Sequence, residues 1–190
     1  ARPSGRGRSS GPPAARTPRF WHTGEVMGDA VGRRVVVVGS GIAGLTCARS
    51  LAGRGFEVRV VSPGEPGRDG ASHRLHGMAP FILVAAPWVR GDSPGLFAAD
   101  IDRRAEGLRR PGLGEVMAEA AHDAVRELMA WLDLRPIANE PIGLPGDGVA
   151  RGLPCLPGHG RALLQPALAS CAAGGVQMEG RTLVVGLVRE

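Results

Sequence analysis

The chain has 190 residues, a length that suits one domain with a hydrophobic core and a tail. It contains no lysine, and its 23 arginines and 18 acidic residues give a formal net charge of +5. The excess lies in residues 1–34, which hold seven arginines and two acids, whereas residues 35–190 hold 16 of each. This distribution excludes a basic nucleic-acid-binding surface on the folded part, and no nucleic-acid partner is expected.

Residues 1–30 are predicted to form a disordered basic tail. They are rich in Pro, Gly, Ser and Arg and contain too little apolar surface to become ordered by themselves. Three interpretations are open: an organelle transit peptide, a basic arm that contacts acidic partners, or an extension that is not native. We favour the third, with translation starting at Met27, just before the first predicted strand.

Residues 33–63 are predicted to form a strand, a glycine turn, a helix and a second strand, from the sequence RRVVVVGSGIAGLTCARSLAGRGFEVRVVSP. Four consecutive valines indicate a first strand that is buried on both faces. The helix is expected to begin near Ile42, and Gly53 and Gly55 are expected to end it before a strand at 56–61. This βαβ order predicts a dinucleotide-binding fold.

Each glycine of the turn has a separate expected task. Gly39 turns the chain sharply after the strand, Gly41 leaves room for a pyrophosphate at the backbone, and Gly44 lets the helix pack closely on the strand. The pyrophosphate would lie at the first N–H groups and the positive dipole end of the helix. The predicted site in this turn consists of Gly39, Ser40, Gly41, Ile42, Ala43 and Gly44.

Ser62 occupies the end of the second strand, where dinucleotide folds usually place an acidic residue that binds the adenosine ribose. A serine can still exchange one hydrogen bond with a ribose hydroxyl, but it lacks the two oxygens of a carboxylate. Glu65 comes three residues later, in a predicted turn. Ser62 is therefore the predicted ribose-binding residue.

The remaining elements are predicted as helices and strands around this unit. A helix at 93–109 would be capped by Ser93, and a helix at 113–132 carries an apolar stripe that indicates a core-facing side. Residues 134–158 are predicted to form a loop, followed by a helix that Pro166 should kink or delay and by one or two strands within residues 176–188.

Neither a membrane span nor a metal site is predicted. No apolar run reaches the length that crosses a bilayer, and the three cysteines are far apart without a CxxC pair. No cluster of His, Cys, Asp and Glu has metal-ligand spacing. A cytoplasmic location is expected.

Two segments carry a family resemblance: VRVVSPGEPGRDGASHRLHGMAPF and GDSPGLFAADIDRRAEGL. They resemble the FAD-binding half of L-aspartate oxidase, a member of the succinate dehydrogenase and fumarate reductase flavoprotein family. Many aspartate oxidases carry Ser or Thr at the position of Ser62, followed by a lysine that Pro63 replaces here. The resemblance covers about residues 33–188 and implies an α/β fold, with residues 31–190 forming the N-terminal part of an incomplete, Rossmann-like FAD-binding domain. The capping domain of the family is absent from the matched portion.

The resemblance also implies which residues contact FAD. Where the family reads S-x-x-A-Q-G-G, this chain reads SHRLHGM, with His76 replacing the glutamine and Met78 replacing the second glycine. The loop would lie near the flavin, and a later strand would bind adenine through its backbone. FAD is expected to be held non-covalently, because the covalent histidine of some relatives lies one residue upstream of the position of His73. The residues implied are Ser72, His73, Leu75, His76, Gly77, Leu183 and Val184.

The implied activity is oxidation of L-aspartate to iminoaspartate, with hydride transfer to flavin N5 and reoxidation by O₂ or fumarate. It would serve de novo NAD biosynthesis, in which quinolinate synthase is the implied partner. The arginines that bind the dicarboxylate follow the matched portion in the family, so no catalytic residue is assigned here and the chain alone is expected to be an inactive fragment. Two alternatives remain: another dicarboxylate dehydrogenase of the family, or a non-catalytic dinucleotide-binding remnant, which His76 and Met78 favour.

Overall fold

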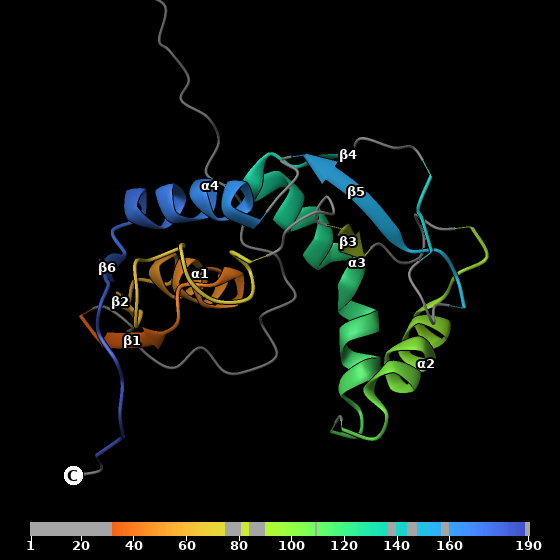
Figure 1. The fold of residues 1–190 in the computed structure, drawn as a ribbon, viewed down its shortest axis with the longest axis horizontal. Helices are drawn as coiled ribbons and strands as arrows, with labels where there is room; N and C mark the ends of the chain where they lie inside the picture. The colour runs from red at the N-terminus through yellow and green to blue at the C-terminus, as the bar shows by residue number, and fades with distance from the viewer. Residues whose placement is uncertain are drawn as a thin grey trace, which may run out of the picture.

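The computed structural model describes residues 32–74, 81–83, 90–108, 110–136, 140–143, 148–156 and 160–188. The predicted tail at 1–30, with Met27, lies outside these residues. Figure 1 shows two groups of elements, a parallel sheet with two helices and a helical pair beside a second sheet.

The parallel sheet contains β1 (Arg34–Val38), β2 (Glu57–Val61) and β6 (Gln177–Glu179) in the order β1-β2-β6. Helix α1 (Ile42–Ala52) connects β1 to β2, and Gly53 forms its C-cap. The strands are in parallel register, with Val37 opposite Val60. The predicted strand, turn, helix and strand are therefore confirmed, with the helix starting at Ile42 as expected.

The prediction that β1 is buried on both faces is wrong. Val37 is 9% exposed, whereas Val36 and Val38 are 59% and 62% exposed. Side chains alternate between the two faces of a strand, and α1 packs on the Val37 face. Among the described residues, no helix or strand covers the opposite face, so the valine run contributes only one buried side.

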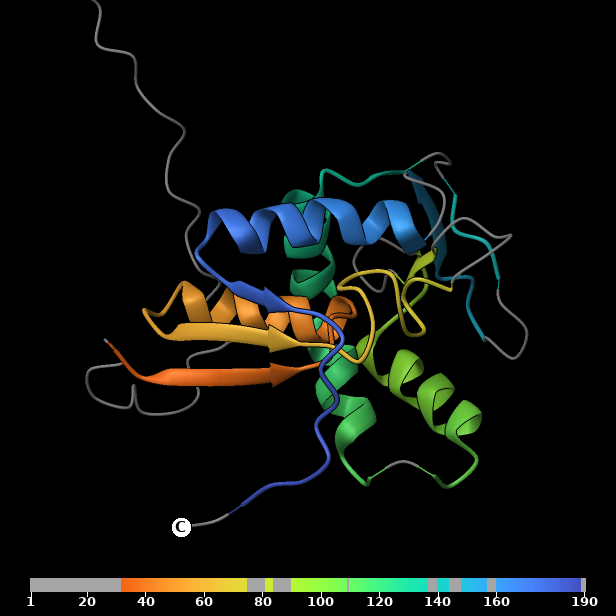
Figure 2. The ribbon, with the colours of Figure 1, turned by 60° about the vertical axis from the view of Figure 1, so that its left-hand side comes forward.

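Helix α4 (Gly160–Ala173) lies beside α1 on the same side of the sheet (Figure 2). Leu45 of α1, Val60 of β2 and Leu164 of α4 are completely buried in the shared core. The helix continues through Pro166 from a start at Gly160, so the predicted delay of its start is wrong. Burial of Leu164 and its neighbours compensates for the hydrogen bond that proline removes.

Helices α2 (Pro94–Ala105) and α3 (Leu113–Leu132) pack against each other. The Ser93 hydroxyl accepts a hydrogen bond from the Leu96 N–H at 3.2 Å, which confirms the predicted cap. Helix α2 ends at Ala105, before the predicted residue 109, because Glu106 takes a left-handed conformation.

The apolar stripe of α3 is only partly a core face, contrary to the prediction. Leu132, at the C-terminal end, is 3% exposed and belongs to the main core. Val116 and Met117, in the first turns, are 60% and 50% exposed. The later turns of α3 lie against the main core, whereas the earlier turns contact α2 through Ala118 and Ala121 and leave Val116 and Met117 exposed.

A second sheet contains β3 (Phe81–Leu83), β5 (Gly152–Leu156) and β4 (Arg135–Pro136) in the antiparallel order β3-β5-β4. The prediction of a loop over 134–158 is therefore wrong for β4 and β5. Proline removes a strand donor, but Pro136 and Pro154 each lie at the end of a short ladder, where the loss is small. The pairing partner of β5 is distant in sequence, which local patterns do not reveal.

The C-terminal residues 182–188 form neither a helix nor a strand, so a predicted second strand in this region is not formed. The Thr182 N–H donates to the Ser62 carbonyl at 2.9 Å, which holds the start of the segment at the end of β2. Leu187 and Val188 are each 93% exposed. None of the described helices is both long enough and apolar enough to cross a membrane.

Candidate dinucleotide-binding site

The glycine turn after β1 has the geometry that its spacing predicts. The Gly39 N–H donates to the Val61 carbonyl at 2.8 Å, and the φ angle of Gly39 is +103°, a conformation that other residues rarely adopt. A Cβ atom on Gly44 would overlap the Gly39 carbonyl oxygen and lie 3.6 Å from Val37 Cγ1. The turn and the close packing of α1 on β1 therefore both require glycine.

The N-terminus of α1 is accessible to an anionic group. Gly41 is its N-cap and supplies no side-chain acceptor, and the first turn contains no acidic residue. The Ile42 N–H donates to the Ser72 hydroxyl at 3.2 Å, and among the described residues a Cβ atom on Gly41 would have only the Ser72 side chain within 4 Å. An oxygen acceptor already lies at the helix terminus, where phosphate oxygens would also accept backbone hydrogen bonds. The cradle therefore fits a pyrophosphate.

Ser62 lies at the carboxyl end of β2, beside the turn. The Ser40 hydroxyl donates to Ser62 Oγ at 3.1 Å and accepts from the Gly67 N–H at 3.0 Å. Ser40 and Ser62 are 3% and 2% exposed, so their hydroxyls lie beneath the surface of the turn. In this arrangement Ser62 supports the turn through Ser40, and its role as a ribose ligand stays a prediction.

A loop from β2 brings Ser72 and His73 over the turn. His73 Nδ1 lies 3.2 Å from the Gly67 carbonyl oxygen, which can only accept, so Nδ1 carries the hydrogen. A Cβ atom on Gly160 would overlap the Ser72 carbonyl oxygen and lie 3.2 Å from that of His73. The start of α4 therefore supports the loop through a contact that only glycine permits.

The other predicted contacts are either outside the described residues or in the C-terminal segment. Leu75, His76 and Gly77, with Met78, lie outside the described residues. Leu183 and Val184 follow the Thr182 contact with Ser62 and are 70% and 40% exposed. Their backbone groups join no strand, and their role toward adenine stays a prediction.

A groove lies at the opposite end of the parallel strands. Ligands of parallel α/β sheets bind at the carboxyl ends of the strands, so this groove is not the dinucleotide site. The groove is lined by Arg34, Val35, Val36, Glu57, Val58, Arg59, Gly175 and Gln177.

Within the described residues, no three His, Cys, Asp or Glu side chains gather as a metal site.

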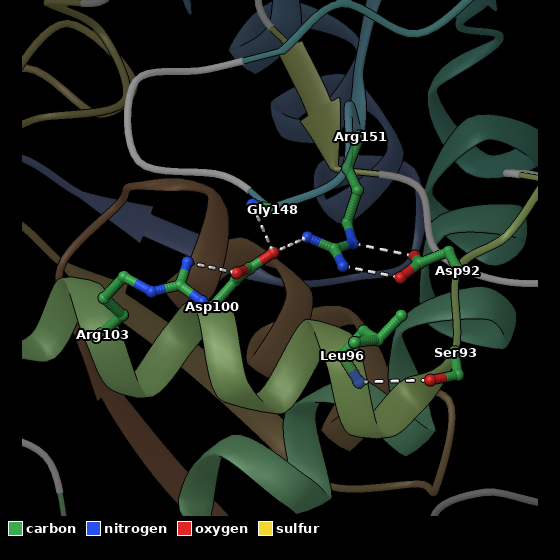
Figure 3. A network of polar contacts seen from close by, with 7 residues as sticks. All are labelled: Asp92, Ser93, Leu96, Asp100, Arg103, Gly148 and Arg151. Carbon is green, nitrogen blue, oxygen red and sulfur yellow. Dashed lines mark hydrogen bonds and ion pairs between the residues drawn. The ribbon is translucent and has the colours of Figure 1, made fainter.

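Arg151, which the sequence analysis did not identify, is completely buried between two carboxylates (Figure 3). Its Nε and Nη2 donate to the two Asp92 oxygens at 2.8 and 2.6 Å, and its Nη1 donates to Asp100. Asp100 also accepts from the Gly148 N–H at 3.1 Å and from Arg103. We call these five residues the Arg151 network. The GDSP segment contained Asp92, but nothing in the local sequence indicated its distant partner.

The network sets the charge states of its members. Hydrogen bonding from Arg151 lowers the pKa of Asp100 from 3.8 to about 2, although burial opposes this effect. Hydrogen bonding to Asp92 raises the pKa of Arg151 above its ordinary value. The guanidinium also lies 4.9 Å from the centre of the Phe97 ring. The two guanidinium groups of Arg151 and Arg103 together balance the charges of the Asp92 and Asp100 carboxylates.

Replacing Asp100 with asparagine is expected to remove part of the acid sensitivity of the fold. The folded pKa is depressed, so the carboxylate stabilises the fold fully above about pH 4 and loses this contribution as the pH falls to about 2. The wild type should be more stable than Asp100→Asn near neutral pH, and the difference in free energy of unfolding should shrink over that interval. Urea titrations at a series of pH values measure it.

Asp133→Asn is the matched control, because Asp133 pairs with Arg135 at the surface and both side chains are largely exposed. Exposed ion pairs contribute about 0–1 kcal/mol, so little pH-dependent difference is expected there. A gap between wild type and Asp100→Asn that stays constant down to about pH 2 would contradict the assigned pKa shift.

The sequence matches the family described as "FAD binding domain" over residues 34–190. A comparison with curated proteins finds no match. The fold is similar to that of a 3-ketosteroid-Δ4-(5α)-dehydrogenase from Rhodococcus jostii RHA1, with 19% identity, a TM-score of 0.57, and coverage of 82% of this chain and 39% of the other.

Two further solved structures share the fold. A flavocytochrome c3 fumarate reductase has 22% identity and a TM-score of 0.63, with 86% of this chain and 29% of the other covered. The Mycobacterium smegmatis Sdh1 complex has 18% identity and a TM-score of 0.64, with 80% and 28% covered. The chain therefore spans between about a quarter and two fifths of the length of these proteins. The family match extends over the glycine turn and nearly all described elements, and the chain belongs to the FAD-binding domain family, with FAD as its cofactor.

Proposed function

We propose that this chain is the nucleotide-binding part of an FAD-dependent oxidoreductase of the succinate dehydrogenase and fumarate reductase type. The observation that carries the proposal is the accessible N-terminus of α1, framed by Gly41 and by the Ser72 hydroxyl, within a chain of the FAD-binding domain family. FAD supplies the redox chemistry when bound, and the protein binds and orients it.

Each part of the site would contact a different part of FAD. The N–H groups at Gly41–Gly44 would donate to the pyrophosphate, and Ser72 would stay beside it as a further hydrogen-bonding group. Ser62 would serve the ribose side, and His73 would lie toward the flavin without a covalent bond. Because His73 Nδ1–H is already bonded to the Gly67 carbonyl, the ring has a defined orientation. Leu183 and Val184 would contact the adenine through their backbone.

L-Aspartate is the substrate that we propose for the whole protein, with the product entering the reaction of quinolinate synthase. Ser62 and the GDSP segment support this branch. Within that segment, Ser93 caps α2 and the Asp92 carboxylate accepts a hydrogen bond from Arg151. Another dicarboxylate dehydrogenase is the second candidate, since a fumarate reductase shares the fold. Sequencing the genomic locus past Glu190 separates both candidates from a non-catalytic dinucleotide-binding remnant. Arginines that bind a dicarboxylate should be encoded there for either enzyme, and a stop codon at that point would contradict both.

Cofactor binding is tested by titrating the purified chain with FAD and following quenching of flavin fluorescence. We expect saturable binding at one FAD per chain, competition by ADP, and no competition by riboflavin, because the turn binds the pyrophosphate and riboflavin has none. Binding of riboflavin as tight as that of FAD would contradict the assigned cradle. Absence of FAD binding would contradict the proposed function.

A further inference from the structure

The Arg151 network joins elements that are far apart in the sequence. Asp92 lies just before α2, Asp100 lies within α2, and Arg151 lies directly before β5. Figure 3 shows the guanidinium between the two carboxylates, with Asp92 bound by two parallel hydrogen bonds. The side chains of Arg151 and Asp92 are both 0% exposed, and that of Asp100 is 4% exposed. The network therefore fixes the start of β5 to α2.

Strand β5, which follows Arg151 directly, is connected to the loop that carries Ser72 and His73 on the expected flavin side of the site. Gly152 of β5 pairs with Leu83, and β3 follows the loop that carries Ser72 and His73. In the other direction, β5 precedes α4, whose first residue is Gly160. Gly160 lies against the Ser72 and His73 carbonyls. Both strands of the β3–β5 ladder thus connect, along the chain, to the same loop.

This ladder needs an external support to hold its position. It pairs three residues of β3 with three of β5, and the other edge of β5 adds only a two-residue pairing with β4 and a bridge to Ile142. So small a sheet has little stability of its own in water. Losing one partner of a buried ion pair leaves an uncompensated charge, which is strongly destabilising. Without Arg151, the buried Asp92 carboxylate would lose the two hydrogen bonds described for it, and Asp100 would keep Arg103 and Gly148 but lose its link to β5. The ladder and α2 would then have to separate or rearrange.

We propose that Arg151 is a positioning residue for FAD: by fixing the β3–β5 ladder to α2, it holds the Ser72–His73 loop and Gly160 in the arrangement that accepts the flavin-side half of the cofactor. The proposal rests on the proposed function. The turn from Gly39 to Gly44 belongs to the β1–α1–β2 unit, and none of the hydrogen bonds of the network reaches it. ADP, which contains only the adenosine and pyrophosphate part, therefore reports on the turn and on the Ser72 hydroxyl beside it, whereas FAD also reports on the flavin side of the loop.

The test compares FAD and ADP affinities of the full chain carrying Arg151→Met or Arg151→Lys. Lysine retains the positive charge between the two carboxylates, so this variant should fold even if methionine prevents folding. It cannot form the two parallel bonds to Asp92, so it still tests the positioning role. We expect FAD affinity to fall by about 10-fold or more and ADP affinity to fall by about 3-fold or less, through loss of the Ser72 contact alone, with Arg151→Lys intermediate. Cooperative unfolding in urea verifies that each variant is folded.

Arg103→Gln is the matched control, because Arg103 contacts the same Asp100 carboxylate from within α2, with a 58% exposed side chain, and so does not join β5 to α2. It should leave both affinities unchanged. Equal losses of FAD and ADP binding in Arg151→Lys, or no loss of either, would overturn the positioning role alone. Failure of the wild type to bind either nucleotide would overturn the proposed function and, with it, this assignment.

Discussion

Replacing Gly41 with valine is expected to reduce FAD affinity by at least about 100-fold while the chain stays folded. The Gly41 φ angle is −74° and its ψ angle is 176°, a conformation that valine adopts without strain. The new side chain would project over the N-terminus of α1, where the pyrophosphate must approach the backbone. Its Cβ atom would lie 3.3 Å from Ser72 Oγ, which would have to shift slightly, and no other described residue lies within 4 Å of that Cβ position.

Two measurements separate loss of binding from loss of folding in this variant. Fluorescence titration gives the FAD affinity, and urea denaturation gives the free energy of unfolding, which should change by less than about 1 kcal/mol. Gly95→Val is the matched control, because Gly95 lies in α2, away from the turn, and its Cβ would be 3.9 Å from Ser93 Oγ. Normal FAD binding by Gly41→Val would refute the assignment of the turn to the pyrophosphate.

Replacing Gly44 with alanine is expected to damage the fold itself. The added Cβ atom would overlap the Gly39 carbonyl oxygen, which is backbone and cannot rotate away. Helix α1 would have to move off β1 and disturb the core around Val37 and Leu45. Overpacking of this kind lowers the free energy of unfolding by about 1–3 kcal/mol. Because the added atom would collide with backbone, we expect Gly44→Ala to lose about 3 kcal/mol or more. Urea denaturation measures the loss.

Gly53→Ala is the comparison for this second variant. Gly53 ends the same helix with a right-handed φ of −62°, and its nearest Cβ neighbour would be the Arg49 carbonyl oxygen at 3.4 Å. Alanine there should be neutral or should stabilise the chain by up to about 1 kcal/mol, since it restricts the unfolded chain. Similar free energies of unfolding for Gly44→Ala and Gly53→Ala would show that the close approach of α1 to β1 has no energetic role.

The elements of the nucleotide unit were predictable because their signals are local. The strand before Gly39, the start of α1 at Ile42 and the Ser93 cap were all expected from neighbouring residues, and the structure confirms them. A turn with a positive φ angle, a capping hydroxyl and a helical period each depend on residues within about one or two turns of chain. The family resemblance added FAD, and the family match confirms that cofactor.

Features that join distant segments were not predictable in the same way. The exposure of Val36 and Val38 depends on what covers the sheet, and the pairing of β3 with β5 depends on segments about 70 residues apart in the chain. Gly160 resembled an ordinary helix start, and Arg151 resembled one of many surface arginines.

The amino-acid sequence by itself determined the glycine turn, the βαβ order and the cofactor class, because these depend on backbone geometry over a short stretch of chain. Only the tertiary structure decided how that turn is supported: Ser72 at the Ile42 N–H, Gly160 beneath the loop, and Arg151 between two carboxylates. Such contacts depend on packing between segments that are distant in the sequence, and burial gives them their strength because water no longer competes for the same hydrogen bonds.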